Sequence, residues 1–482
     1  MYTSPKSSFR SFLFSRKVRF EWFTTFALFL ITCTLLLWIY PFPNVYSDTG
    51  AYIDAAKRND FGIYRPIGYS WFMAFAHAIS PNPDVLVILQ AFLYFLSSLI
   101  LYLTLRFFFY DGKAWMWSVF YFIFLLAPTC IYIINFVISD SIFISFTNLW
   151  VASLLWIIGT RKTSAVFWNS LFLILLLQIR FIALFYPLLS VIAIFLAFFK
   201  NNKLRFLLFS GLQVVLFLGI IWITAWQTGK TTGVAILSGF SGWQKANNVM
   251  HVLPYIKLKP EEIKDPMIRK VHAFIVTNTP AEYYPPKDSI VVLYLWAHNS
   301  PLKKYMYHLK GSSKKSYLHH WHKASIPLNQ WSSYIIRKHP GLFLKHFIWP
   351  NTLLLFNMYN EALFIFPEPS HQMKEWFECY NCTVKPRYNF LHKFLAQFSS
   401  KIFNILWLLF FLSLISLCFR LKIRVTTQQY HMLLLVSFFC ITYVAMSVYA
   451  SPIVLRYLLV IRHSLIMVPF LLFIHLFPLN KT

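Results

Sequence analysis

The sequence predicts an all-α integral membrane protein that crosses the bilayer about ten times. The chain of 482 residues is 58% hydrophobic and only 12% charged. Uncharged runs recur, among them residues 22–40, 85–105 and 206–229, and about 20 apolar residues span a bilayer core as a helix. Lys and Arg gather in short segments between such runs, which is typical of cytoplasmic turns. These observations exclude a soluble enzyme.

The N-terminal region predicts a cytoplasmic tail, an anchor and an outer loop. Residues 1–20 contain five Lys or Arg and no acid, so we expect them on the cytoplasmic side. Residues 21–41 form the first predicted transmembrane helix. We interpret it as a retained anchor, because the run is too long for a signal peptide and no small-residue cleavage site follows. Residues 42–83 are then an extracytoplasmic loop with interfacial helices.

Residues 84–226 are long enough for transmembrane helices 2–7. Residues 85–105 supply one crossing. Residues 114–160, whose only charge is Asp140, would be about 70 Å long as a helix, enough for two crossings of a core roughly 30 Å thick. Residues 163–199 have Arg180 near their middle and at about 55 Å form a second hairpin. Residues 206–226 cross once more.

The segment 227–400 predicts an extracytoplasmic domain, mainly α or α+β. It is too long for a structureless connection in a compact protein, and it holds nine of the sixteen acids. Residues 401–482 supply transmembrane helices 8–10. The domain is therefore inserted before the last three helices.

Ionisable residues predicted near membrane level on the outer side form the candidate site. Charges at that depth are costly and usually face a cavity or a partner. Each residue alone could instead be a helix-end group that snorkels or pairs. Together, acids and arginines on one side of the membrane indicate a site for an anionic, lipid-bound substrate. The residues are Asp48, Asp54, Arg65, Asp140, Arg180 and Arg456.

Several short motifs resemble the GT-C superfamily of polytopic glycosyltransferases, in particular protein O-mannosyltransferases and bacterial lipid A aminoarabinose transferases. The matching segments are Tyr46-Ser-Asp48-Thr-Gly-Ala-Tyr52 after the first helix, Arg65-Pro-Ile-Gly-Tyr69, Ser139-Asp140-Ser141 and Arg456-Tyr457. The resemblance covers residues 20–230 and 400–478 in layout, whereas the large loop is matched only by position.

The resemblance implies a reaction and assigns residues to it. The donor would be a polyprenyl-phosphate sugar, and Asp48 would act as the general base in an inverting attack on its anomeric carbon. Asp140 and Asp54 are candidates for a second acid. Donor phosphate would bind Arg65, Arg180, Arg456 and, from the large loop, Lys245. Tyr52, Tyr69 and Tyr457 would line the substrate.

The expected partners are this donor, an acceptor that is a lipid, glycan or protein, and membrane lipids. We expect no nucleic-acid partner, because the charge flanks apolar segments and no nucleic-acid module is recognisable. Some superfamily members hold a divalent metal through Asp-x-Asp, a motif absent from this sequence. We therefore expect no cofactor, with a divalent metal as the alternative that this motif does not support. The location implied is the bacterial inner (plasma) membrane, with the active site on the extracytoplasmic face.

Two other functions compete with this one. An O-antigen-type polymerase or ligase would share the lipid-linked substrate. A lipid-linked sugar transporter or flippase is less favoured, because transporters often show repeats and Gly- or Pro-interrupted helices, whereas this chain has 13 Gly and no visible repeat.

Two smaller patterns concern cysteine and histidine. Cys379-x-x-Cys382 predicts a local disulfide, with free thiols as the alternative. His319-His320-Trp-His322 predicts an exposed basic loop rather than a metal site.

Overall fold

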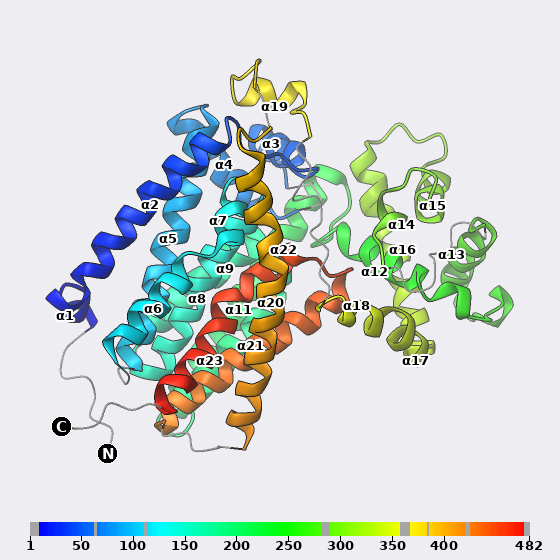
Figure 1. Ribbon diagram of the computed structural model, residues 1–482. Coiled ribbons are helices and arrows are strands. Elements are labelled where there is room, and N and C mark those ends of the chain that lie inside the picture. The colour runs from blue at the N-terminus through cyan, green and yellow to red at the C-terminus, as the bar shows by residue number, and fades with distance from the viewer. Residues whose placement is uncertain are drawn as a thin grey trace.

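The computed structural model describes residues 9–61, 65–109, 113–280, 290–356, 367–382, 385–419 and 425–476. None of the described residues forms a strand, so the predicted all-α class is confirmed and the α+β alternative for the large loop is not supported. A single isolated bridge joins Asn44 to Phe136. Figure 1 shows a tilted bundle of long helices with a second group of shorter helices beside it.

Eight helical segments in the described part of the chain are long and apolar enough to cross a membrane, which identifies an integral multi-pass membrane protein. They match eight of the ten predicted crossings. They comprise α2 (Arg19–Ile39), α5 (Pro83–Phe108), α6 and α7 (Ala114–Leu125 and Pro128–Ile134), α8 (Asp140–Thr160), the 3₁₀ turn Phe181–Phe185 with α10 (Tyr186–Phe198), α11 (Lys203–Thr232), α21 (Thr427–Ala450), and α22 (Leu455–Leu458) with α23 (Arg462–Leu476).

The other two predicted crossings fall on shorter apolar segments. One is α9 (Thr163–Ile179), and the other is the apolar part of α20, Ile402–Cys418. Helix α20 itself runs from Asn389 to Cys418, so it begins before residue 401, where the last three helices were expected to start. Among the residues that the structure describes, length and composition therefore support eight crossings.

The loop after α2 folds into two helices at one end of the bundle, α3 (Thr49–Arg58) and α4 (Gly68–Ile79). The short helix α19 (His371–Trp376) packs on α3. Gln372 donates to Asp54 with a 2.6 Å separation, and the Trp376 ring stacks on His77. Cys379 and Cys382, which follow α19, are joined as the predicted disulfide.

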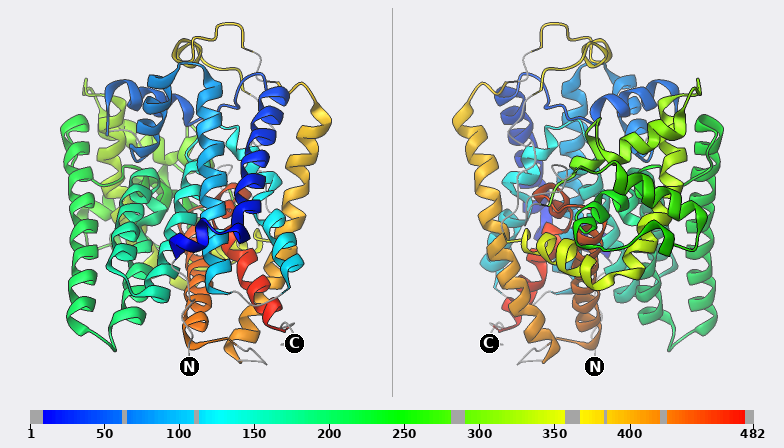
Figure 2. Two further views of the ribbon diagram at one scale, coloured as in Figure 1. Left: turned by 90° about the vertical axis from the view of Figure 1, so that its left-hand side faces the viewer. Right: turned by 90° about the vertical axis from the view of Figure 1, so that its right-hand side faces the viewer.

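Residues 240–280 and 290–353 form a second group of helices with its own hydrophobic core, separate from the core of the bundle. Figure 2 shows this group beside the bundle, at the height of the long helices, rather than stacked beyond their ends. Its members are α12 (Phe240–Met250), α13 (Pro266–Thr277), α14 (Leu293–Trp296), α15 (Pro301–Lys310), α16 (Tyr317–Lys338), α17 (Pro340–Phe343) and α18 (Trp349–Leu353).

The crossing of α12 over α16 organises this group. Gly242 on α12 lies so close to α16 that an added Cβ would be 2.0 Å from the carbonyl oxygen of Ser325. The Trp243 ring stacks on Trp321 at a centroid distance of 4.1 Å, and its indole N–H donates to the Trp321 carbonyl. The missing side chain at Gly242 therefore allows the two helices to meet at their backbones.

Candidate functional site

Hydrogen bonds hold the loop that contains Asp48 against the connection between α7 and α8. The Asn44 N–H donates to the carbonyl of Asn135, and the Val137 N–H donates to the carbonyl of Asn44, both at 2.9 Å. The Thr49 hydroxyl donates to the Val137 carbonyl and accepts from the Tyr46 N–H, also at 2.9 Å. Because these groups are buried, their pairing fixes the loop firmly. It brings two segments about 90 residues apart in sequence into contact.

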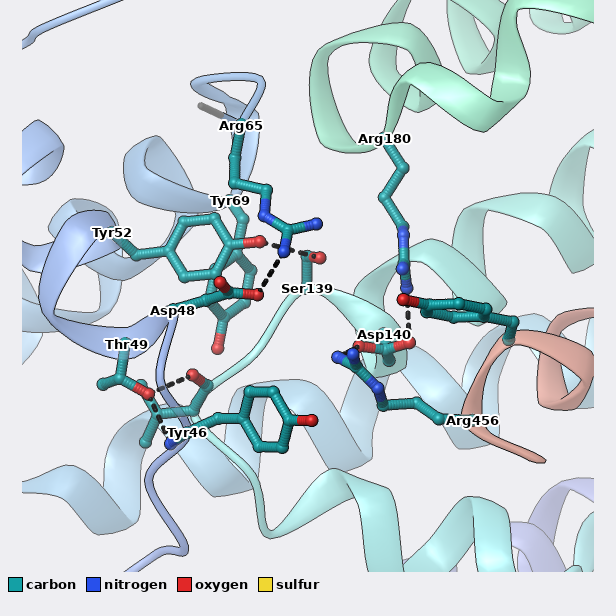
Figure 3. Close-up of polar contacts among 12 residues, drawn as sticks. Tyr46, Asp48, Thr49, Tyr52, Arg65, Tyr69, Ser139, Asp140, Arg180 and Arg456 are labelled. Carbon is teal, nitrogen blue, oxygen red and sulfur yellow. Dashed lines mark hydrogen bonds and ion pairs between the residues drawn. The ribbon is translucent and has the colours of Figure 1, made fainter. Parts of the chain in front are cut away.

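Asp48 forms an ion pair with Arg65. Its Oδ2 lies 2.7 Å from a guanidinium nitrogen of Arg65, and both side chains retain partial exposure to solvent. Burial alone would lower the pKa of Arg65, but the Asp48 carboxylate raises it above its ordinary value. The Tyr52 hydroxyl beside this pair donates to Ser139 Oγ at 3.1 Å. Figure 3 shows Arg65, Asp48 and Tyr52 converging from α3 and the segment before α4.

Asp140, the first residue of α8, binds two arginines. Arg180 donates to its Oδ1, and Arg456 lies 3.1 Å from its Oδ2. The Asp140 side chain is only 1% exposed, and that of Arg456 is 4% exposed. The three residues come from α8, the end of α9 and α22, so this cluster ties three parts of the bundle together (Figure 3).

Aromatic rings surround the arginines. The Arg456 guanidinium lies 4.6 Å from the centre of the Tyr46 ring, and Arg180 lies 5.5 Å from that of Tyr457. Arg65 lies 5.1 Å from the ring of Phe240, the first residue of α12. Such cation–π contacts add attraction without neutralising the charge. The second helix group therefore reaches the candidate site through Phe240.

A cavity of about 780 Å³ lies where these elements meet. Arg65 and Arg180, which we call the arginine pole, line it together with Tyr52, Ser139 and Tyr457. Part of its wall is apolar, formed by Ile179, Phe181, Ile182, Leu184 and Met446. Another part, which we call the amide face, comes from α12 and α16 and consists of Gln244, Lys245, Asn248, Ser325, Asn329 and Gln330.

Five of the ten sequence-predicted site residues line this cavity, namely Tyr52, Arg65, Arg180, Lys245 and Tyr457. Asp48 and Asp140 each contact an arginine of its lining, and Arg456 lies behind Asp140. Lys245 lines it from the amide face. Two others lie elsewhere. Asp54 contacts Arg58 and Gln372 on α3 and α19, and buried Tyr69 donates to Gln90 at 3.1 Å.

Apart from Lys245, sequence reasoning missed the residues of the amide face, and it also missed Phe240. The spacing of polar residues could have revealed the amide face, because residues three or four apart lie on one side of a helix. One such set is Ser241, Gln244, Lys245 and Asn248, and a second is Ser325, Asn329, Gln330 and Ser333. It also missed Asn44 and Thr49, whose role depends on a partner far away in the sequence. A further buried ion pair, Glu21 with Arg106, joins α2 to α5 away from the cavity.

The histidine run does not lie in an exposed loop, contrary to the sequence-based prediction. His319, His320 and His322 are buried on α16. His319 hydrogen-bonds to the Thr232 carbonyl and His322 to that of Leu318. Across the residues that the structure describes, no three His, Cys, Asp or Glu side chains are grouped as metal ligands. The run therefore packs α16 against the end of α11.

Comparison of the chain with protein-family models, with curated proteins and with solved structures found no match.

Proposed function

We propose that this chain is a membrane glycosyltransferase that transfers a sugar from a polyprenyl-phosphate donor to an extracytoplasmic acceptor. The observation that carries the proposal is the composition of one cavity. Its arginine pole adjoins an apolar wall formed by Phe181, Ile182 and Leu184. A polyprenyl phosphate joins an anion to an apolar chain, so both parts of the donor find a complementary surface there. Guanidinium groups bind phosphate through charge-assisted, bidentate hydrogen bonds.

In the proposed reaction, the acceptor hydroxyl oxygen forms a bond to the anomeric carbon of the sugar. The bond between that carbon and the phosphate oxygen breaks, and its electron pair leaves with the polyprenyl phosphate. The hydroxyl proton passes to the Asp48 carboxylate. Arg65 and Arg180 stabilise the charge that develops on the departing phosphate, which is where preorganised cations accelerate group transfer most.

The Asp48–Arg65 ion pair implies that the donor binds before the acceptor is deprotonated. A donor phosphate that enters beside Arg65 competes with Asp48 for the guanidinium. As the pair loosens, the carboxylate becomes free to accept a proton from the acceptor. A positioned general base typically contributes about 100- to 10,000-fold to the rate. Donor binding would therefore prepare the base for the second substrate.

Asp140 serves a different purpose in the proposal. Both of its oxygens are engaged by arginines and its side chain is 1% exposed, so it is a poor base for an incoming hydroxyl. We assign it as a positioning residue that orients Arg180 toward the cavity. Asp54 lies outside the arginine pole, and the scheme gives it no chemical role.

The test is turnover of a panel of polyprenyl-phosphate sugars by purified full-length protein, in parallel with Asp48→Asn. The expected result is sugar transfer or slow donor hydrolysis that falls at least about 100-fold in the variant. Asp84→Asn, at the outer start of α5 and away from the cavity, is the matched control and should keep full activity. Equal activity of Asp48→Asn and wild type would refute Asp48 as the base.

The transporter alternative gives a different outcome in the same experiment. Tight binding of polyprenyl phosphate without turnover of any donor, together with movement of labelled lipid between the leaflets of proteoliposomes, would replace the transferase proposal. A polymerase or ligase would instead transfer a preassembled glycan, so the panel includes lipid-linked oligosaccharides.

A further inference from the structure

The amide face differs chemically from the arginine pole. It carries four carboxamides, one hydroxyl and one amine, on Gln244, Asn248, Asn329, Gln330, Ser325 and Lys245 respectively. It contains no carboxylate. Carboxamides and hydroxyls both donate and accept hydrogen bonds, as the hydroxyls of a sugar do. The apolar wall lacks such groups, so the cavity has a second polar surface beside the arginine pole.

Two buried side chains of the amide face have spare hydrogen-bonding capacity. Gln244 is 8% exposed and Asn248 is 1% exposed, and both line the cavity. The Asn248 amide N–H group donates to the carbonyls of Tyr449 and Ala450 at 3.0 Å, which fixes its orientation. Within the described residues, Asn248 Oδ1 and Gln244 Nε2 have no hydrogen-bond partner. Buried polar atoms are normally paired, so these two atoms point to a ligand.

Lys245 adds a positive charge without a carboxylate partner among the described residues. Its Nζ donates to Asn329 Oδ1 at 2.7 Å and to Ser333 Oγ at 3.1 Å. An ammonium group has three protons, so one remains. Burial lowers the pKa of Lys245, and the nearby Arg337 lowers it further. A negatively charged ligand would relieve both effects, because it stabilises the protonated amine.

Lys245 is also displaced from the arginine pole along α12. Phe240, which contacts Arg65, begins the helix, and Lys245 lies five residues later. At 1.5 Å per residue this is about 7.5 Å along the axis. Asn248 continues the same face by another turn. From Phe240 to Asn248 these positions extend over about 12 Å of the helix axis.

From these observations we propose that the amide face is the acceptor subsite, and that it binds a hydroxyl-rich glycan carrying an anionic group beside Lys245. The inference rests on the proposed function, which requires an acceptor in the same cavity as the donor. It also reassigns Lys245: the resemblance implied a contact with the donor phosphate, whereas its hydrogen bond to Asn329 places it within the amide face.

The experiment measures glycan binding, with no donor present, by full-length protein in lipid nanodiscs. The probes are a tetrasaccharide of galacturonic acid and the neutral tetrasaccharide of galactose. Wild type should bind the anionic probe at least about tenfold more tightly, since a charge-assisted hydrogen bond exceeds a neutral one. Lys245→Met should lose this preference and keep neutral binding. Lys245→Arg should retain it, which separates loss of charge from misfolding.

Lys323→Met is the matched control, because Lys323 is an exposed lysine on α16 outside the cavity. It should bind both probes as wild type does. Equal binding of the two probes by wild type, or an unchanged preference in Lys245→Met, would overturn the inference. A third arm uses a short-chain prenyl phosphate. If Lys245→Met weakens this probe instead, Lys245 belongs to the donor and the inference is again overturned.

Binding in this assay requires neither a donor nor turnover. Loss of the anionic preference therefore tests the subsite even if no donor is ever turned over. Conversely, donor turnover that depends on Asp48 would stand even if neither glycan bound. The two proposals can fail separately.

Discussion

Gly68 lies directly against the main chain of Gln178: a Cβ at Gly68 would be 2.6 Å from the Gln178 carbonyl oxygen. This contact joins the start of α4 to the end of α9. Arg65 precedes Gly68 by three residues, and Arg180 follows Gln178 by two. The spacing between the two arginines of the pole is therefore set by a backbone approach that only glycine permits.

Replacing Gly68 should separate the arginines. We expect Gly68→Ala to push α4 from α9, to lower stability by about 1–3 kcal/mol as overpacking does, and to weaken short-chain prenyl phosphate binding several-fold. Thermal unfolding and phosphate binding measure the two effects. Gly219→Ala on α11 is the control, because no atom lies within 4 Å of its added Cβ. Similar behaviour of the two variants would contradict this role for Gly68.

Removing the charge of Asp140 should destabilise the bundle. Asp140→Asn leaves Arg180 and Arg456 without their shared anion, and breaking a buried ion pair typically costs about 3–5 kcal/mol. Asp48 is more exposed than Asp140 and pairs with one arginine instead of two, so Asp48→Asn should cost less than Asp140→Asn. Melting temperatures of the two variants compare them. A melting temperature for Asp140→Asn equal to that of Asp48→Asn would show that the cluster is not the structural tie inferred here.

Arg180 should not be replaceable by lysine. Arg180 contacts Asp140 and faces the cavity at the same time, and a planar guanidinium can serve two anions where a lysine amine acts as a point charge. We expect Arg180→Lys to weaken short-chain prenyl phosphate binding about tenfold or more. Arg58→Lys is the control, because Arg58 is an exposed residue of α3 that pairs with Asp54. It should leave prenyl phosphate binding unchanged. Retained affinity in Arg180→Lys would remove Arg180 from the arginine pole.

The second helix group should lose stability in acid. Burial lowers the pKa of His251 to about 4, although a hydrogen bond to the Val291 carbonyl raises it. In the unfolded chain the value is about 6.5, so the unfolded state binds the proton first as pH falls. Stability from neutral His251 is complete above pH 6.5 and decreases toward pH 4, by about 3 kcal/mol in total.

Thermal unfolding followed by tryptophan fluorescence measures this effect, because Trp243, Trp321 and Trp331 are buried in the second helix group and become exposed when it unfolds. The melting temperature should fall between pH 7.5 and 5, and less so in His251→Gln, which cannot gain the proton. Because His272 also has a lowered pKa from burial, some dependence should remain. A pH profile identical in His251→Gln and wild type would exclude His251 as a source of the effect.

Some features of this protein follow from its sequence alone. Long uncharged runs predicted the all-helical, multi-pass architecture, because a bilayer core accepts little else than a helix of about 20 apolar residues. The same reasoning placed Asp140 and Arg180 at the outer ends of hairpins, and in the structure they form an ion pair. The position of Asp48 after the first hydrophobic run placed it in the candidate site, and in the structure its contact with Arg65 joins two parts of the same loop.

Only the tertiary structure decided which of these residues meet the cavity and what else lines it. In sequence, Asp54 and Tyr69 were site candidates in the same way as Asp48 and Tyr52. In the structure, Asp54 on α3 contacts Gln372, and Tyr69 on α4 contacts Gln90. The amide face depends on the crossing of α12 and α16, whose closeness results from the small volume of Gly242. Hydrophobic patterning specifies a helix and its buried side. Which distant helix it contacts depends on packing between side chains that the linear sequence does not bring together.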